Sequence, residues 1–521
     1  MEEEVLRLPR TRNATRNIVT GIVNKTVIIV LPFVIRTLII YALGIEYTGL
    51  NGLFSSVLEV LNLSELGFSS AVVYSLYSPI AKKDEETVCS LLNFYRKVYV
   101  FIGVFILCIG LLLMPFIKYL IKGSYPNDIN IYWLFFIFLF NSSLSYWFLG
   151  YKAVLLNAYQ RVDILFNIST IANGILYVCQ IIVLVFCKNY YYYILLMPCF
   201  TIINNLIIAK EVKRLFPQYR CQGKLSNEIK KDIKKKIFAL MIGKINGISR
   251  NSLDNIFISA FMGLTYSAIY SNYYSIMSSI ISVLGIITGG MQAGVGNSIQ
   301  TESEHQNYLD LKRFTFMYMW LAGWCTICLI CLFQPFMALW VGADKLLPFS
   351  AMILLCMYFY ILKMGDIQSI YFQAVGLWWE GKHLSLIEAA ANLILNFWLV
   401  HKWGIHGIIL ATVMTLFFMN FFFLGRVTFR HYFKCEKWTE YFKDQLKYIL
   451  VTVFACSVTY YLCRLWSDML GTSRIECLTT IVKRSILCLV VPNGIYFCAY
   501  RKSKLFYSTQ KWLLNRRVIK K

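Results

Sequence analysis

The sequence is poor in charged residues, which make up only 15% of its 521 positions, and acidic residues are scarcer than basic ones. Hydrophobic residues make up 58%, which leaves too few polar residues to form the surface of a soluble protein of this length. Apolar runs long enough to cross about 30 Å of hydrocarbon recur along the whole sequence. These features predict an all-α polytopic membrane protein.

Signatures of catalytic chemistry are also missing. No phosphate-binding G-x-x-x-x-G-K-[ST] loop and no H-E-x-x-H pair is present, and the five histidines and sixteen cysteines are not arranged as two separate ligand pairs at the spacing of a zinc site. The cysteines lie mostly in apolar segments, which indicates small buried side chains rather than a disulfide framework. We therefore expect no enzyme activity, no catalytic residue, no cofactor and no metal site.

Hydropathy and turn signals predict about fourteen transmembrane helices separated by short polar segments. Two of the predicted spans are longer than one crossing requires, and we expect these two to extend into the cytoplasm. The predicted spans lie near residues 18–42, 47–77, 95–121, 129–156, 164–187, 190–212, 237–260, 264–299, 312–337, 347–374, 383–401, 405–432, 446–466 and 478–500.

The basic residues give a formal net charge of +24, and they are unevenly placed. They gather in the N-terminal segment, in 210–236, in 426–447 and in the tail from Arg501. Basic clusters in loops on one side of a membrane protein set its orientation and attract anionic headgroups of membrane lipids. We therefore expect both termini to be cytoplasmic and expect no binding of nucleic acid. The polar N-terminal segment has no short apolar core before a cleavage site, so no removable signal peptide is expected.

The chain repeats itself at a shift of 219 residues. Six predicted spans separate equivalent points, so the two halves have the same membrane orientation and form a parallel repeat. Two parallel six-helix lobes favour a transporter that rocks about a central site. The shift aligns Lys25 with Lys244, Gly44 with Gly263, Tyr47 with Tyr266, Tyr99 with Tyr318 and Asn173 with Asn392.

The repeat and the charge clusters together predict the domain organisation. It consists of two six-helix lobes, a basic cytoplasmic linker between them, and two C-terminal helices with a basic tail that lie outside the repeat. The corresponding ranges are 1–212 for the N-terminal lobe, 213–236 for the linker, 237–432 for the C-terminal lobe and 433–521 for the extra helices and tail.

Cations inside apolar segments are costly, and they usually face a water-filled cavity or a partner. The run NKTVIIVLPFVIRTL holds Lys25 and Arg36, which are about 16 Å apart along one helical face with Pro32 between them. A net positive cavity favours an anionic substrate such as a phosphate or diphosphate group, which arginine binds in bidentate fashion. The residues expected to form this cationic substrate-binding cavity are Lys25, Arg36, Lys244, Arg250 and Lys363.

Structural alternatives stay open for each cation. The two lysines of the repeat can reach the headgroups, and the remaining cations can form ion pairs that hold helices together. The acidic residues available for such pairs, which can instead carry coupling protons or sodium, are Glu59, Glu65, Asp254 and Asp366. Three aromatic side chains of the eighth predicted span are candidates for stacking on sugar rings, with helix packing as the alternative: Tyr270, Tyr273 and Tyr274.

The segment LGIEYTGLNGLFSSVLEVLNLSELGFSSAVVYSLYSPIAKKD, residues 43–84, carries a resemblance to a known family. With the preceding NKTVIIVLPFVIRTLII, it resembles the opening helices of the bacterial polysaccharide flippases that act on O-antigen or capsule repeat units. These flippases belong to the multidrug/oligosaccharidyl-lipid/polysaccharide exporter superfamily. Arg36, the glycine turn LG..YTGLNGLF and the motif SELGFSSA carry the match, and the layout of the spans extends it over the whole chain.

The resemblance implies a multi-pass protein of the bacterial cytoplasmic (inner) membrane that flips an undecaprenyl-diphosphate-linked oligosaccharide to the outer leaflet by alternating access. Its implied role is polysaccharide biosynthesis, as in lipopolysaccharide O-antigen assembly, with other polysaccharide-assembly proteins as partners. One alternative is a flippase for the peptidoglycan lipid precursor. Another is an integral-membrane polysaccharide polymerase, which would be expected to have a large external loop with catalytic residues.

Overall fold

The computed structural model describes residues 10–65, 68–231, 233–234, 237, 247, 249–467 and 474–518. Every regular element in this part of the chain is a helix, as predicted. Contacts divide the chain into two compact units, Met1–Ala268 and Ile269–Lys521, called unit 1 and unit 2 below. The predicted domain boundary lay earlier, in the basic segment 213–236.

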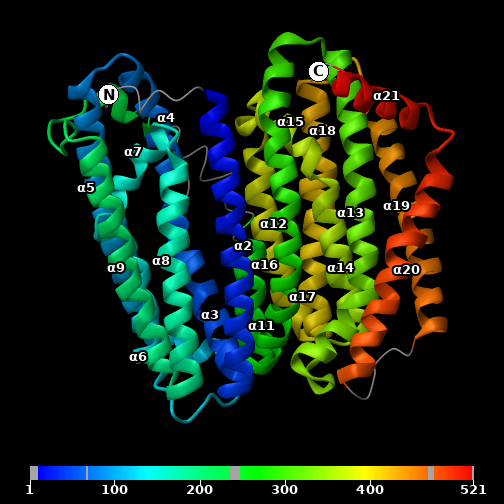
Figure 1. The fold of residues 1–521 in the computed structure, drawn as a ribbon, viewed down its shortest axis with the longest axis horizontal. Helices are drawn as coiled ribbons and strands as arrows, with labels where there is room; N and C mark the ends of the chain where they lie inside the picture. The colour runs from blue at the N-terminus through cyan, green and yellow to red at the C-terminus, as the bar shows by residue number, and fades with distance from the viewer. Residues whose placement is uncertain are drawn as a thin grey trace. The chain divides into compact units, whose positions relative to one another are not determined.

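Unit 1 is built from long apolar helices joined by short breaks (Figure 1). Its main packing pairs are α2 with α8, α5 with α6, and α9 with both α6 and α8. The elements of this unit are α2 (Arg10–Ala42), α3 (Ile45–Leu61), η1 (Asn62–Glu65), α4 (Phe68–Ala81), α5 (Glu85–Leu113), η2 (Met114–Leu120), α6 (Ile131–Trp147), η3 (Gly150–Lys152), α7 (Ala153–Ala158), α8 (Val162–Ile182), η4 (Val183–Cys187), α9 (Tyr190–Leu215), η5 (Ser249–Leu253) and α11 (Asp254–Met262).

The helix segment η5–α11 packs on α3 and η2 of unit 1. The sequence instead placed this segment at the start of the C-terminal lobe. A backbone hydrogen bond from the amide of Lys122 to the carbonyl of Ser259, at 3.1 Å, ties α11 to the segment after η2. The next helix, α12 (Leu264–Thr301), begins in unit 1 and continues into unit 2.

Unit 2 packs around α13, which contacts α14, α19 and α20. The two C-terminal helices predicted to lie outside the repeat, α19 and α20, therefore belong to this unit and share a core with α13. The elements of this unit after α12 are α13 (Glu304–Val341), η6 (Ala343–Lys345), α14 (Phe349–Met364), α15 (Asp366–Val375), α16 (Trp378–Trp403), α17 (Ile405–Thr415), η7 (Leu416–Phe423), α18 (Leu424–His431), α19 (Trp438–Trp466), α20 (Arg474–Tyr500) and α21 (Lys504–Val518).

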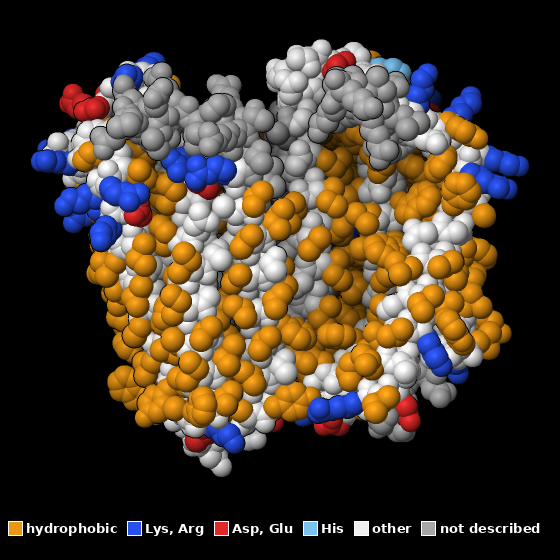
Figure 2. Space-filling view, viewed as in Figure 1, with side chains coloured by type: hydrophobic (Ala, Val, Ile, Leu, Met, Phe, Trp, Pro, Cys, Tyr) orange, Lys and Arg blue, Asp and Glu red, His pale blue; other side chains and the backbone are white. Residues whose placement is uncertain are grey.

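Large hydrophobic side chains are exposed along the helices of both units. Leu112 is 71% exposed, Phe186 79% and Leu450 68%. Figure 2 shows hydrophobic side chains covering the helices, with Lys and Arg side chains gathered beyond them. Apolar surface on this scale needs a lipid solvent, which confirms the predicted polytopic membrane fold.

Ten helices in the described part of the chain are long and apolar enough to cross a membrane, or eleven if α6 and η3–α7, bent by 45°, form one span. The prediction of about fourteen spans included three further segments that are not among these eleven. Span 47–77 is broken at η1, span 237–260 includes residues outside the described ones, and span 478–500 lies in α20, which carries Lys483 and Arg484.

The predicted repeat is visible at one pair of glycines. Gly44 precedes α3 with φ 127°, and Gly263 precedes α12 with φ 94°. A left-handed backbone of this kind favours glycine because a Cβ atom would be strained there. The same sharp break between two helices therefore occurs at equivalent points of the two halves.

Candidate functional site

Unit 1 contains a cavity of about 660 Å³ between α2, α3, α6, α8 and α9. This volume is in the range of pockets that hold small molecules. The lining is rich in amide and hydroxyl side chains, which come from α3, α6, α8 and α9, whereas α2 contributes Arg36 and apolar side chains. Its members are Pro32, Ile35, Arg36, Ile39, Thr48, Asn51, Gly52, Ser55, Asn141, Ser145, Asn173, Leu176, Tyr177, Gln180, Tyr193, Met197, Phe200, Thr201, Asn204 and Asn205.

Arg36 supplies the only charge among these lining residues. It lies in α2 one helical turn after Pro32, and its side chain is half-buried. Because proline has no amide hydrogen, the carbonyl of Ile28 in the preceding turn loses its helical donor, and helices bend at such points. The cavity is therefore cationic, and Pro32 of α2 also lines it.

The amide side chains of the cavity are held by short contacts with neighbouring helices. Thr201 donates to Oδ1 of Asn141 at 2.8 Å, and Asn205 donates to the carbonyl of Phe148 at 2.8 Å. Gln180, only 1% exposed, donates to the carbonyl of Tyr193 at 3.4 Å. Asn204 differs, because its Oδ1 atom is buried and has no hydrogen-bond partner in the described structure. A donor group entering the cavity would satisfy this oxygen.

Lys25 does not line the cavity. Its neighbour Asn24 is buried against α8, where it donates to Oγ1 of Thr170 at 2.9 Å and to the carbonyl of Phe166 at 3.4 Å. Lys25 itself is exposed on α2. Its predicted repeat partner, Lys244, lies outside the described residues.

A second polar region joins α3 to η5 and α11 within unit 1. Ser252 donates to Oε2 of Glu59 at 2.7 Å, and Asn255 donates to Oγ of Ser56 at 3.1 Å. Arg250 is half-buried in η5, a π-helical turn of a kind often found at functional sites, and Asp254 is 1% exposed at the start of α11. The fold thus brings Glu59, Arg250 and Asp254 to one seam, although these residues do not line the cavity of Arg36.

Glu65 lies elsewhere in unit 1. It accepts a hydrogen bond from the hydroxyl of Tyr99 at 3.1 Å. The ring of Tyr99 packs against those of Tyr95 and Tyr146, with centroids 4.3 and 5.4 Å away. Glu65 is therefore part of an aromatic cluster and is not among the cavity-lining residues.

Lys363 and Asp366 form a buried ion pair in unit 2, with Nζ 2.7 Å from Oδ2. Lys363 is 4% exposed in the last turn of α14, and Asp366 opens α15 after the break at Gly365. The hydroxyl of Tyr318 donates to the same carboxylate oxygen. An ion pair was the alternative to a substrate-binding role for Lys363, and the structure contains that ion pair.

The three candidate tyrosines of α12 differ in their surroundings. Tyr273 is fully buried, donates to Oε1 of Gln334 at 3.0 Å and packs on Phe333. Tyr270 is 3% exposed, while Tyr274 is half-buried, and their rings are stacked with centroids 6.1 Å apart. In this structure the ring of Tyr273 is covered by protein and is not accessible for stacking on a sugar.

Sequence reasoning missed three features. The amides of the cavity carry no charge and so gave no signal, except Asn173, which was noted only as a repeat position. Arg484, 2% exposed in α20, was overlooked although it lies in an apolar segment. Three cysteines of unit 2, far apart in sequence, meet at one point.

Taken together, these features describe a multi-pass membrane protein with a polar cavity among its helices. No match to the chain exists among protein-family profiles or among curated proteins. Solved structures do match. The lipid II flippase MurJ, in an inward closed conformation, aligns with TM-score 0.64 and 15% identity over 93% of this chain and 100% of its own.

Two further solved structures have the same fold. A multidrug resistance MATE family transporter of the MOP superfamily, in an inward-facing conformation, aligns with TM-score 0.60 and 16% identity over 81% of this chain and 100% of its own. A MOP superfamily transporter from Pyrococcus furiosus, described as having a binding pocket of reversed polarity, aligns with TM-score 0.53 and 13% identity over 82% and 98%. At these identities the matches show that the chain has the fold of the MOP superfamily, as its sequence resemblance implied.

Proposed function

We propose that the protein is a flippase that moves an undecaprenyl-diphosphate-linked oligosaccharide, an O-antigen or capsule repeat unit, from the cytoplasmic to the outer leaflet by alternating access. The observation that carries this proposal is the cavity in unit 1, where a single guanidinium is surrounded by uncharged amides and hydroxyls. The guanidinium of Arg36 suits a phosphate oxygen pair. The amides suit the hydroxyl groups of sugars.

The chemistry of the cavity disfavours other cargoes. A cationic drug would be repelled by Arg36, since no carboxylate is among the lining residues. A purely apolar lipid would leave the buried Oδ1 atom of Asn204 without a hydrogen-bond donor, at a cost of about 1–3 kcal/mol. An anionic, hydroxyl-rich headgroup avoids both penalties.

The seam of α3, η5 and α11 is the proposed place of energy coupling. Glu59 accepts from Ser252 of the π-helical turn that holds Arg250, and Asp254 directly follows that turn, so a change in the protonation of either carboxylate would alter the charge balance there. Lys25, which lies outside this cavity, and Lys244 remain proposed substrate contacts, whereas Lys363 pairs with Asp366. Tyr274 remains a proposed sugar contact, while Tyr270 is only 3% exposed. We expect Arg250→Ala to abolish surface polysaccharide at normal protein level, and unchanged surface display would remove Arg250 from the mechanism.

A specific observation favours a second candidate function, flipping of the peptidoglycan lipid precursor. The MurJ lipid II flippase aligns over its entire length and over 93% of this chain. Both cargoes would present a diphosphate to Arg36, so the cavity charge does not separate them. Under either proposal the protein works in the bacterial inner membrane with both termini cytoplasmic.

Deletion of the gene in its native bacterium separates the two cargoes. The first proposal predicts loss of surface polysaccharide, accumulation of the lipid-linked oligosaccharide on the cytoplasmic side, and continued cell-wall synthesis. Complementation with the wild-type gene should restore all three readouts. Arrest of wall synthesis with accumulated peptidoglycan precursor would contradict the first proposal and support the second.

A further inference from the structure

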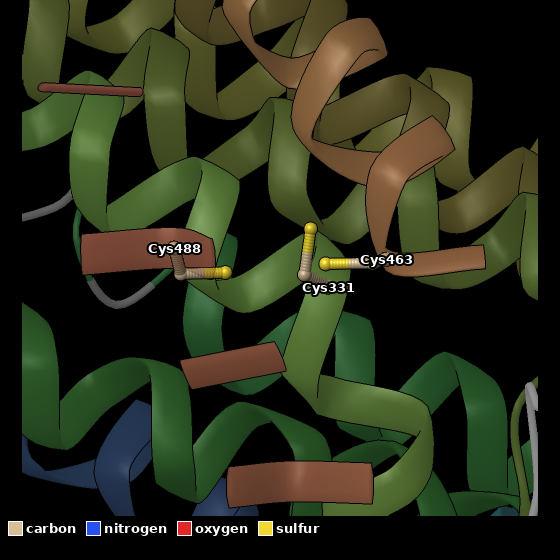
Figure 3. Close-up of side chains that lie close together, drawn as sticks. All are labelled: Cys331, Cys463 and Cys488. Carbon is tan, nitrogen blue, oxygen red and sulfur yellow. The ribbon is translucent and has the colours of Figure 1, made fainter. Parts of the chain in front are cut away.

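Three cysteines from three different helices of unit 2 converge on one point. They are Cys331 of α13, Cys463 of α19 and Cys488 of α20, and their Sγ atoms all lie within 4.8 Å of one another. Each side chain is at most 1% exposed. Figure 3 shows the three sulfur atoms directed toward one another.

The three residues are free thiols. A metal ion bound to three sulfurs at about 2.3 Å would hold those sulfurs about 4.0 Å apart, as the geometry of an equilateral triangle requires. The observed separations are at most 4.8 Å, so none exceeds this spacing by as much as 1 Å. Small side-chain rotations would therefore bring all three sulfurs into metal-binding distance without moving a helix.

The helices that carry the cysteines are firmly held together. Each of α13, α19 and α20 packs against the other two, and the cysteines belong to their shared core. The carbonyl of Cys331 accepts from Nη1 of Arg484 at 3.1 Å, and the carbonyl of Cys488 accepts from Nε1 of Trp324 at 2.8 Å. Two of the three cysteine backbones are thus fixed by buried donors, a support that metal sites commonly have.

The positive charge of Arg484 would partly offset the negative charge of a metal–thiolate cluster. Thiols bind metal ions as thiolates, after losing their protons, so three thiolates around a monovalent ion carry net negative charge. The buried guanidinium also donates to Oγ of Ser467 at 3.0 Å, and Ser467 directly follows α19. Cys463 lies about one helical turn before that helix end.

We propose that Cys331, Cys463 and Cys488 bind one soft, thiophilic metal ion, Cu(I), in a trigonal thiolate site that ties the two C-terminal helices to α13. Thiolate ligands select soft ions. In the described residues three thiols, and no histidine or carboxylate, form this cluster, and three ligands fit three-coordinate Cu(I) better than four-coordinate zinc. Each thiol that ligates the ion releases its proton to water. The site lies in unit 2, does not depend on the transport proposal, and would have a structural role.

The test uses the full-length protein, purified in detergent under reducing and oxygen-free conditions. Cu(I) is supplied from a competing chelator that removes copper from single thiols. We expect one equivalent of copper to be retained, with sulfur-to-copper charge-transfer absorption in the near ultraviolet and a raised Tm. Cys463→Ser should bind about 100-fold more weakly, since loss of even an outer-shell group costs 10- to 100-fold.

A matched control is Cys356→Ser, because Cys356 is equally buried in α14 but lies outside the cluster. This variant should retain copper as the wild type does. If Cys463→Ser fails to fold, copper retention is measured instead on Cys463→Ala and Cys488→Ala, which keep an apolar side chain and should show the same loss. No retained copper in the wild type, or equal retention in all variants, would show that the thiols serve only in packing and would overturn the proposal.

Discussion

Arg36 and Lys363 are both cations in apolar helices, yet their surroundings are opposite. Arg36 lines a cavity whose other lining residues are uncharged, whereas Lys363 is 4% exposed and bound to a carboxylate at 2.7 Å. Both were expected to face the same substrate. A charge in a membrane helix therefore identifies a constrained position, and only its neighbours separate a binding group from a structural pair.

The repeat offers the same contrast at a pair of asparagines. Asn173 of α8 is half-buried and lines the cavity, while its equivalent Asn392 of α16 is fully buried and donates to Oγ1 of Thr412 at 3.1 Å. The predicted repeat aligns an asparagine at this position in both halves. In unit 1 its amide faces a cavity, and in unit 2 its amide joins two helices.

The largest effect is expected at the ion pair of unit 2. Lys363→Met would leave the carboxylate of Asp366 without its cation, and breaking a buried pair from one side typically costs about 3–5 kcal/mol. The value here should lie near the lower limit, because Tyr318 continues to donate to Asp366. The measurement is thermal unfolding of the purified protein in detergent.

The control is the double variant Lys363→Met with Asp366→Asn, which removes both charges and should recover much of the lost stability. Any loss of transport by the single variant should follow the amount of folded protein. A Tm equal to that of the wild type would contradict the structural role assigned to this pair.

In contrast to Lys363, substitution of Arg36 should lower transport and leave thermal stability nearly unchanged. Arg36→Ala removes a charge-assisted hydrogen bond to an anionic headgroup, which is worth about 1.5–3 kcal/mol, or roughly a 10- to 100-fold loss of transport. The Tm should change little, because the side chain borders a cavity. Surface polysaccharide per molecule of membrane-inserted protein checks this prediction, and normal display would contradict it.

The smallest effects are expected at the two asparagines. Asn392→Ala removes the hydrogen bond to Thr412 and should destabilise the protein by about 1 kcal/mol without a direct effect on transport. Asn173→Ala should lower transport several-fold at unchanged stability. Measuring Tm and transport for both variants tests whether Asn173 serves binding and Asn392 serves helix packing. Identical changes in the two variants would contradict this difference.

Much of the fold could be predicted from the sequence because apolar run length is a local property. Ten of the predicted spans correspond to helices such as α8 and α13 that satisfy the length and composition of a crossing. The breaks were harder to predict. The segment 47–77 is uniformly apolar enough for one helix, but it turns at η1, and α6 bends by 45° before η3.

The candidate site was only partly predictable. Arg36 stood out because cations are rare in such segments, whereas Asn141 and Asn204 did not, since amides in membrane helices also serve packing. The thiol cluster had only a partial sequence signal, the Cys-x-x-Cys spacing of Cys328 and Cys331, because Cys331 and Cys463 are brought together by tertiary packing of α13 with α19.

The central claim, that the cavity of unit 1 binds a negatively charged sugar-lipid headgroup through Arg36, is tested most directly by binding. The measurement is the affinity of purified wild type, Arg36→Lys and Arg36→Ala for a short-chain, water-soluble prenyl diphosphate-linked sugar, by titration calorimetry at fixed salt. We predict affinity that is retained in part by the lysine variant and about 10- to 100-fold weaker in the alanine variant. Equal affinity of all three proteins, or no binding by the wild type, would contradict the claim.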